Sequence, residues 1–403
     1  MSKINVRAFF RFCKVKVIRQ TVNLTEGWVR VVLRPDGRYL PRCHKCGSPV
    51  RDVHCFRTRT IRDLNIFDVR VFLKVIYRVL RCPGCGFVVE DLGLFDPYRR
   101  VTRRLERYIL ELCRLMSIKE VAEHLALSWK TIKAIHKASL VKKFYDEDIG
   151  MVRIIMVDEI SIRKRHRYLT LVVDWETGRV LWIGKGRRYE TLKGFFDSLT
   201  PDQREPIEAV AMDMWDPYIR AVKEGCPSAS IVFDRFHVIS QFNRVIDKVR
   251  NAEYRKATGV GKEVIKGSKY LLLKRAEHLT AEERPKLSAL LELNEALNKV
   301  YVLKEYLGGL WQQFCPEGAM ASLEHWCELA YESGIRALRK FATMLKRHAY
   351  GIINHCFYPI HTSKMEGINN KIKVIKRRAY GFHDTEYFCL VIKDAFASTN
   401  STF

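Results

Sequence analysis

The feature that most constrains this chain is a pair of acidic residues inside an apolar, strand-like stretch. Residues 153–174 read RIIMVDEISIRKRHRYLTLVVD, and Asp158 and Glu159 lie among isoleucine, methionine and valine in its first half. A buried carboxylate without a partner is costly. Neighbouring residues of a strand point to opposite faces, so one of the two acids faces whatever covers the sheet. This strand therefore indicates a functional site.

The segments around this strand predict a fold. Three short apolar segments, 153–162, 168–175 and 179–186, are separated by short turns, and the second turn carries the hairpin signal DWETGR. They predict an antiparallel meander. Beyond them, predicted helices alternate with strands as far as residue 242. Three hairpin strands followed by alternating helix and strand is the order of an α/β ribonuclease H-like core.

Two acids of this predicted core are expected to meet. An acid within its first strand and another at the end of its fourth lie side by side at the sheet, and these acids are Asp158 and Asp213. Close carboxylates repel unless a cation lies between them, and their hard oxygens suit Mg²⁺ or Mn²⁺. We expect Glu366, on a predicted C-terminal helix, to be the third acid. The same helical face carries three further polar residues: Asn370, Lys373 and Arg377. Such a face would place cations along a DNA backbone.

Each acid also has a purely structural interpretation. Asp213 is placed to cap the following helix, and Ser363 with Glu366 forms a possible capping box. Asp174 fits a turn. Asp234, at the end of a later predicted strand, is a rival to Asp213 as the second metal ligand.

Four cysteines near the N-terminus have the spacing of a metal site. Cys43 and Cys46 form one C-x-x-C pair and Cys82 and Cys85 a second, and glycine follows each pair. Such turns point both thiolates at one ion, so two of them predict a closed, structural Zn²⁺ site. The segment 69–81 alternates with a period of two and predicts a strand that ends at Cys82. Ordinary thiols are the alternative interpretation. Three nearby residues rank lower as ligands: His44, His54 and Cys55.

A helix-turn-helix is predicted next. An apolar helical stripe runs along residues 102–115: Leu105, Ile109, Leu112 and Leu115. Ser117 with Glu120 predicts a capping box for a second helix, and Ser128 caps a third. Val121, Ala122, Leu125 and Ile132 would form the small core. The third helix would enter a DNA major groove with four residues: Lys130, Thr131, Lys133 and His136. A helical hairpin with a solvated basic face is the alternative. Glycine is common at such a turn, and Ala126 stands there instead.

Composition supports a polyanionic partner. Lysine and arginine number 71 against 45 acids, which gives a formal charge of +26. The sequence has no apolar run long enough to span a membrane and no signal peptide pattern, so we expect a cytoplasmic, nucleoid-associated protein. Five tryptophans are interpreted as packing residues rather than base-stacking platforms: Trp175, Trp182, Trp215, Trp311 and Trp326.

Several of these stretches resemble the ISL-three family of bacterial insertion-sequence transposases. The matching parts are both cysteine pairs and residues 158–187, 211–222, 233–239 and 366–382. The resemblance implies a zinc-binding N-terminus, a helix-turn-helix and an Asp-Asp-Glu transposase core, with Asp158, Asp213 and Glu366 as the catalytic acids. It also implies metal-assisted cleavage of DNA at the terminal inverted repeats, followed by attack of the released 3′-hydroxyl on target DNA.

The resulting prediction is a multi-domain protein. It comprises a β-rich zinc-binding domain (1–98), a helix-turn-helix (99–148), a ribonuclease H-like core in two parts (149–249 and 336–403) and an all-α insertion (250–335). We expect a homodimer or higher oligomer on DNA, because two transposon ends must be joined. A DNA-binding regulator that no longer cuts, and a nuclease that cuts without joining, are the rival functions.

Overall fold

The computed structural model describes residues 12–163, 167–361 and 363–397. The chain divides into two compact units, Met1–Lys143 and Phe144–Phe403. Among the described residues, no helix is both long and apolar enough to cross a membrane.

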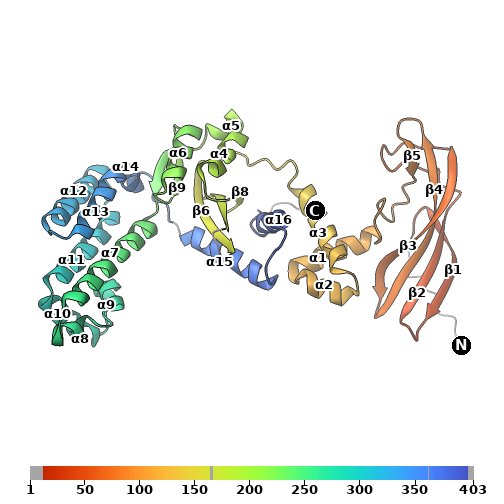
Figure 1. Cartoon of the computed structure of the whole chain (residues 1–403). Helices are drawn as coiled ribbons and strands as arrows, with labels where there is room; N and C mark the ends of the chain where they lie inside the picture. The colour runs from red at the N-terminus through yellow and green to blue at the C-terminus, as the bar shows by residue number, and fades with distance from the viewer. Residues whose placement is uncertain (1–11, 164–166, 362, 398–403) are drawn as a thin grey trace. The chain divides into compact units, whose positions relative to one another are not determined.

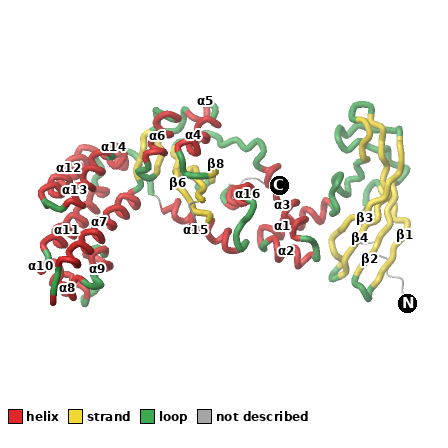
Figure 2. The backbone as a smooth tube through the Cα atoms, viewed as in Figure 1, coloured by secondary structure: helices red, strands yellow, loops and turns green. Residues whose placement is uncertain are grey.

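The first unit combines a sheet with three helices, drawn in yellow and red in Figure 2. Its elements are β1 (Val15–Asn23), β2 (Trp28–Pro35), β3 (Val53–Ile66), β4 (Val69–Cys82), β5 (Gly86–Val89), α1 (Arg103–Leu115), α2 (Ile118–Leu125) and α3 (Trp129–Lys143). The strand order is β1-β2-β4-β3, and β5 also pairs with β4. The β2–β4 pair is parallel and the other pairs are antiparallel.

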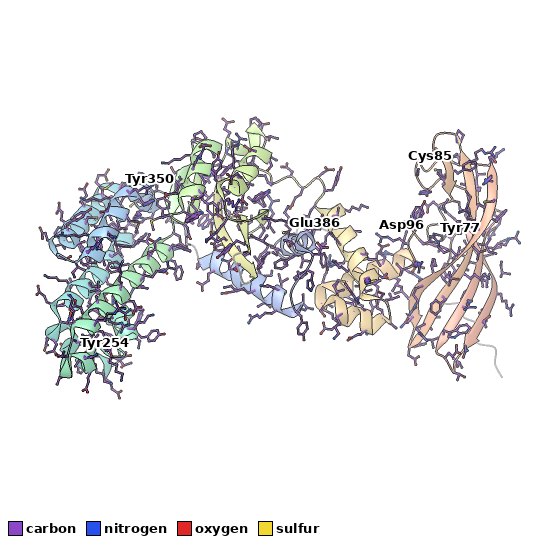
Figure 3. The ribbon with its side chains drawn as sticks, viewed as in Figure 1. Tyr77, Cys85, Asp96, Tyr254, Tyr350 and Glu386 are labelled. Atoms are coloured by element: carbon purple, nitrogen blue, oxygen red, sulfur yellow. The ribbon has the colours of Figure 1, made fainter. Side chains whose placement is uncertain are left out.

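Strand β4 is the centre of this sheet, as its alternating sequence predicts. Its inward residues are buried: Val71, Leu73, Val75, Tyr77 and Val79. The ring of Tyr77, labelled in Figure 3, meets the ring of Phe95 edge-on, with centroids 6.1 Å apart. Full burial of an aliphatic side chain contributes roughly 1.5–3 kcal/mol, so this alternation stabilises the strand that leads to Cys82.

The three helices form the predicted helix-turn-helix. Ser117 and Glu120 make both hydrogen bonds of a capping box at the start of α2, and the backbone N–H of Lys130 donates to Ser128 Oγ at the start of α3. Ala126 ends α2 in the left-handed region, with φ 50°, a conformation that costs a non-glycine residue about 1–2 kcal/mol. The predicted core is buried: Val121, Ala122, Leu125 and Ile132. The stripe prediction was wrong for Leu115, which is 74% exposed.

A buried carboxylate ties the sheet to these helices. Asp63 on β3 is completely buried, and it accepts hydrogen bonds from Thr102 Oγ1 and Arg104 Nε, each at 2.7 Å. Thr102 also caps α1, since its hydroxyl accepts from the N–H of Leu105. Leaving a buried charge unpaired would be strongly destabilising, so this network fixes where α1 begins.

The second unit is built on a five-stranded sheet. Its strands are β6 (Ile154–Arg163), β7 (Arg167–Asp174), β8 (Val180–Lys185), β9 (Ala209–Met212) and β10 (Ser230–Phe233), in the order β10-β9-β6-β7-β8. The predicted meander β6–β7–β8 is antiparallel, whereas β9 and β10 run parallel to β6. Asp174, predicted as a turn residue, is the last residue of β7, and its Oδ1 accepts from the N–H of Glu176 in the turn that follows.

Helices cover both faces of this sheet (Figure 1). On one face lie α4 (Tyr189–Ser198), α5 (Pro201–Arg204) and α6 (Asp216–Gly225), and on the other lie α15 (Ser363–Arg378) and α16 (Thr385–Ala395). Alternate residues of β6 accordingly belong to two separate cores. Ile155 and Val157 pack on the first face, and Met156 and Ile160 on the second. Asp158 and Glu159 therefore face different helices, as strand geometry requires.

Helices fill the chain between β10 and α15. They are α7 (Arg235–Lys256), α8 (Gly259–Ile265), α9 (Lys269–Leu273), η2 (Ala276–His278), α10 (Glu283–Leu293), α11 (Glu295–Gly309), η3 (Leu310–Gln312), α12 (Pro316–Glu332), α13 (Arg336–Arg347), α14 (Ala349–Ile353) and η4 (Asn354–Cys356). Trp326 is buried here between the rings of Phe242 and Phe341, with centroids 5.5 and 5.7 Å away.

The tryptophans confirm the packing prediction with one exception. Trp326 is in the core, and Trp175, Trp182 and Trp311 are half-buried against core residues. The prediction was wrong for Trp215, whose side chain is 41% exposed. Trp215 directly precedes the first turn of α6 and lies at the wall of a pocket that Tyr168 and Lys185 also line.

Candidate active site and metal centres

The four cysteines converge on one point of the first unit. The Sγ atoms of Cys43, Cys46, Cys82 and Cys85 all lie within 4.8 Å of one another. Cys43 and Cys82 are buried, and the Sγ atoms of Cys46 and Cys82 are 3.7 Å apart. Cys85 is labelled in Figure 3. Four thiols at this spacing match the tetrahedral four-thiolate arrangement that Zn²⁺ prefers.

Local chain geometry produces this convergence. Each C-x-x-C pair closes a tight turn: the N–H of Gly47 donates to the carbonyl of Cys43, and the N–H of Cys85 to that of Cys82. Gly47 and Gly86, which follow the two pairs, have φ values of 72° and 73°. Glycine adopts this left-handed conformation without steric cost.

The lower-ranked candidates lie outside the cluster of four cysteines. His44 Nδ1 lies 2.9 Å from the carbonyl oxygen of Val89, and the His54 ring packs on Phe87 with a centroid separation of 4.6 Å. Cys55 lies on β3, outside both turns.

The second site begins with Asp158, which lies within β6 and faces α15. Its Oδ2 accepts a hydrogen bond from Asn369 Nδ2 at 2.6 Å, and its Oδ1 accepts from the N–H of Glu159 at 2.7 Å. These two hydrogen bonds explain how the carboxylate of Asp158 is accommodated in an apolar strand. One donor is the adjoining backbone, and the other is on a helix 211 residues further along the chain.

Asp213 directly follows β9, the strand paired with β6. The parallel register pairs Ile154, Ile155 and Met156 of β6 with three successive residues of β9: Ala209, Val210 and Ala211. This pairing brings Asp213, which follows the carboxyl end of β9, to the same end of the two strands as Asp158.

A histidine and a further acid complete this corner. His237 Nδ1 is 2.6 Å from Asp213 Oδ2, and His237 Nε2 is 3.7 Å from Asp234 Oδ2. The three residues form a compact group in which the possible ligand atoms lie within 4.8 Å of one another. Asp234 also caps α7, because its carboxylate accepts from the N–H of Phe236. Asp234, the predicted rival of Asp213, thus lies close to it and also caps a helix, and its role at a metal stays a prediction.

The electrostatics reflect crowded negative charge. Burial raises the pKa of Asp158, and the charge of Asp213 raises it further. Burial likewise raises the pKa of Glu159, again assisted by Asp213. For His237, burial lowers the pKa, but the hydrogen bond to Asp213 and the surrounding carboxylates outweigh it, and the net shift is upward. A bound cation would relieve this repulsion.

Glu159 faces the α4 and α6 side of the sheet. Arg187, in the loop before α4, pairs with it at 3.5 Å. On the same face, Thr170 Oγ1 and Tyr218 Oη lie 2.7 Å apart and are buried. The adjacent acids Asp158 and Glu159 therefore have different partners. Asp158 accepts from the side-chain amide of a helix residue, and Glu159 pairs with a guanidinium.

The remaining residues predicted for the acidic site and for DNA contact lie on helix α15. Its buried side comprises Met365, Ile368 and Ile372. The predicted face is exposed throughout: Glu366, Asn370, Lys373 and Arg377. Glu366 lies one turn before Asn369, the residue that contacts Asp158, and it makes no hydrogen bond or ion pair with the other described residues. Its catalytic role stays a prediction.

The predicted DNA-reading face of α3 is partly exposed. Lys130 is exposed, whereas Thr131, Lys133 and His136 are half-buried. Their role in recognising bases also stays a prediction.

Comparison with known proteins decides the family. A family model described as transposase matches residues 155–392, and the model for the helix-turn-helix domain of transposase family ISL3 matches residues 90–138. This chain belongs to the ISL3 transposase family. The model for the zinc finger of transposases IS204, IS1001, IS1096 and IS1165 matches residues 40–86, which include all four clustered cysteines. The cluster is accordingly a structural zinc site.

Two curated relatives of this ISL3-family chain are transposases by name. The transposase for insertion sequence element IS1001 of Bordetella parapertussis is 40% identical over 370 residues, which cover 91% of both chains. The transposase for insertion sequence element IS1557 of Mycobacterium tuberculosis is 28% identical over 381 residues, covering 88% of this chain and 85% of the relative.

Sequence reasoning missed two contact residues of the acidic site, His237 and Asn369. A signal existed for His237, which follows Asp234 by three residues, the spacing of one helical turn. Nothing in the sequence distinguishes Asn369 from Asn370, because only the rotation of α15 decides which amide faces β6.

Proposed function

We propose that this ISL3-family chain is a DNA transposase with a ribonuclease H-like core, interrupted by the helices between β10 and α15. The observation that carries the proposal is that Asp158 lies within β6 while Asp213 directly follows β9, the strand paired with β6. The sheet order β10-β9-β6-β7-β8, with an antiparallel meander and two parallel strands, supports that core.

The acidic site suits a hard divalent cation. Its possible ligands are carboxylates, and Asn369 Oδ1 is a buried oxygen without a hydrogen-bond partner in the described part of the chain. In this proposal Asp158, Asp213 and Glu366 hold Mg²⁺ or Mn²⁺. The bound metal would stabilise negative charge on a DNA phosphate and lower the pKa of a water nucleophile.

The surrounding side chains keep the acids in place. Asn369 holds the Oδ2 atom of Asp158, and His237 contacts Asp213. Groups of this kind orient metal ligands and raise their effectiveness. Neither residue needs to touch DNA to do so.

DNA binding is divided between two surfaces in this proposal. The helix-turn-helix reads the terminal inverted repeats through the exposed side of α3, and the basic end of α15, with Lys373 and Arg377, contacts phosphates. The formal charge of +26 fits a protein that follows a long polyanion. Two transposon ends held together call for at least a dimer on DNA, in the cytoplasm at the nucleoid.

A plasmid assay tests the proposal. A supercoiled plasmid carrying the inverted repeats that flank the coding sequence is incubated with the protein and Mg²⁺. Joined products are expected. Cuts without joining would identify a nuclease instead, and binding without cutting a regulator.

A variant ties the assay to the site. Asp158→Ala is expected to abolish both cutting and joining, because the acid at the centre of β6 is lost, while repeat binding measured by gel shift stays within about two-fold. Cutting by Asp158→Ala at the wild-type rate would refute the site assignment.

A further inference from the structure

The second unit has a pocket beside the acidic site that the proposed chemistry does not use. It has a volume of about 780 Å³ and lies between the β8–α4 connection and the start of α6. Its lining combines aromatic rings and cations: Tyr168, Tyr189, Trp215, Lys185, Arg187 and Arg188. This volume lies within the range of pockets that hold small organic molecules, roughly 300–1,000 Å³.

Arg187 joins the pocket to the acids. Its guanidinium pairs with Glu159 at 3.5 Å and lies 4.4 Å from the centre of the Tyr168 ring and 5.4 Å from that of the Trp215 ring. Trp215 follows Asp213 by two residues, and its backbone N–H donates to the Asp213 carbonyl at 2.8 Å. The pocket therefore lies on the face of the sheet that Glu159 occupies and is joined to the Asp213 backbone through Trp215.

Trp215 is positioned as a stacking surface. Its indole Nε1–H donates to the carbonyl of Arg187 at 3.2 Å, which fixes the ring, yet the side chain remains 41% exposed. A large, fixed and exposed aromatic ring at a pocket wall offers one face to a planar partner. Stacking on such a ring is tolerant of base identity, because every nucleobase has a π-face.

The charges of the pocket suit a phosphate. Lys185 and Arg188 are exposed at its wall. Of the two acids in the lining, Asp216 lies 3.3 Å from Arg347, which offsets its charge. The first residues of two helices, α4 and α6, also line the pocket, and neither helix has a side-chain cap among the described residues. The positive ends of the two helix dipoles add to the attraction for an anion.

We propose that this pocket holds one unpaired nucleotide of the DNA substrate, with the base against Trp215 and the phosphate near Lys185 and Arg188. The proposal rests on the proposed function, since it places that nucleotide beside the phosphodiester that the acids would cleave. Withdrawing one base from the stack also frees the adjoining phosphate from the regular duplex, which gives recessed acids such as Asp158 access to it.

The test compares three duplexes of one sequence: fully paired, with a single unpaired nucleotide at the centre, and with an unpaired abasic unit there. Dissociation constants are measured by fluorescence anisotropy with the full-length protein in EDTA, so no cleavage is required. Both bulges bend DNA, and only the first carries a base. The wild-type protein is expected to bind the base-bearing bulge more tightly than the abasic one by roughly 5- to 150-fold, the range measured for a stacking aromatic.

Variants assign the preference to Trp215. Trp215→Ala is expected to bring the ratio of the abasic to the base-bearing dissociation constant close to one, and Trp215→Phe to retain most of it. Tyr306→Ala removes a comparably exposed aromatic outside the pocket, 38% against 41%, and is expected to change nothing. Equal wild-type affinities for the two bulges, or a ratio that survives Trp215→Ala, would overturn the proposal.

The phosphate contacts and the DNA origin of the nucleotide are tested separately. Replacing Lys185 and Arg188 together by alanine is expected to reduce the slope of log affinity against log salt by roughly two, and an unchanged slope would remove them from the proposal. Free thymidine monophosphate is expected to compete poorly with the bulged duplex. Efficient competition would make the pocket a free-nucleotide site and overturn the assignment to DNA.

The outcomes separate this inference from the transposase chemistry. A protein that prefers the base-bearing bulge through Trp215 but leaves the plasmid intact would refute the chemistry alone. A protein that cuts and joins the plasmid without any base preference would refute the pocket alone.

Discussion

The cysteine cluster and the acidic site are both metal-ligand constellations, but they are built in opposite ways. The cysteines come from two tight turns next to paired strands, and all four Sγ atoms lie within 4.8 Å of one another. The acids come from β6, the end of β9 and α15, and only Asp213 lies in such a group, together with Asp234 and His237. The four thiols thus form one group, whereas the three acids do not.

The difference follows from what each metal does. A structural ion replaces part of a hydrophobic core, so its ligands must converge and exclude water. A catalytic ion has to leave room for substrate, and its ligands are carried by a sheet that is stable without it, here with two separate apolar cores on its faces. We therefore expect the cysteines to control the fold of their unit, and the acids to control chemistry with little effect on the fold.

The largest effect is expected at a zinc ligand. Cys82→Ser should reduce the zinc content from about one to near zero per chain, because a structural zinc contributes about 10–16 kcal/mol to the folding of small zinc domains. Atomic absorption measures the metal, and calorimetry should show the melting of the first unit at least about 10 °C lower. The matched control is Cys55→Ser, a neighbouring cysteine outside the cluster. Retention of full zinc by Cys82→Ser would show that the comparison with the acidic site is wrong.

The next effect separates Asp213 from its rival Asp234. Asp213→Asn is expected to reduce plasmid cleavage by about 10³-fold or more, through loss of electrostatic stabilisation at the reacting phosphate. Asp234→Asn keeps the helix cap and should retain most activity, since asparagine caps as well as aspartate. Initial cleavage rates in Mg²⁺ measure both. The reverse ranking would transfer the metal-ligand role to Asp234.

Smaller losses are expected from the residues that position the acids. Asn369→Ala and His237→Ala should each reduce cleavage by roughly 10- to 100-fold, the usual cost of removing a group that orients a metal ligand. The losses should appear as a higher Mn²⁺ concentration for half-maximal rate, with DNA affinity unchanged. Val374→Ala, at an exposed position of α15 outside the predicted DNA-contacting face, is the control. An equal loss in Val374→Ala would indicate a general disturbance of the helix.

The smallest effect is expected on the basic end of α15. Arg377→Ala should weaken binding to repeat and unrelated duplexes alike and reduce the salt slope by about one, because a single phosphate contact is lost. Lys130→Ala on α3 should instead weaken the repeat more than the unrelated duplex. Anisotropy titrations at several salt concentrations distinguish the two, and a selective loss in Arg377→Ala would contradict a backbone-only role.

Local sequence signals predicted the fold well. The cysteine spacing, the capping box at Ser117 and the alternation of β4 each depend on residues a few positions apart, and the structure confirms all three. Contacts between residues far apart in the sequence were harder to predict. That Asp158 lies in β6 and Asp213 directly after the neighbouring strand β9 could be predicted from the order of elements. The Asp158–Asn369 hydrogen bond could not, because it depends on the rotation of a helix 211 residues further along the chain.

By itself, the sequence determined which segments form strands and helices, which thiols share a zinc ion and which family the stretches resemble, because these depend on periodicity and short-range geometry. Tertiary structure alone decided that Asn369 contacts Asp158, that His237 pairs with Asp213 and that Trp215 stays exposed. The physical reason is that strand register and helix rotation are fixed only when whole apolar faces are buried together. The register and rotation then decide which polar side chains come into contact.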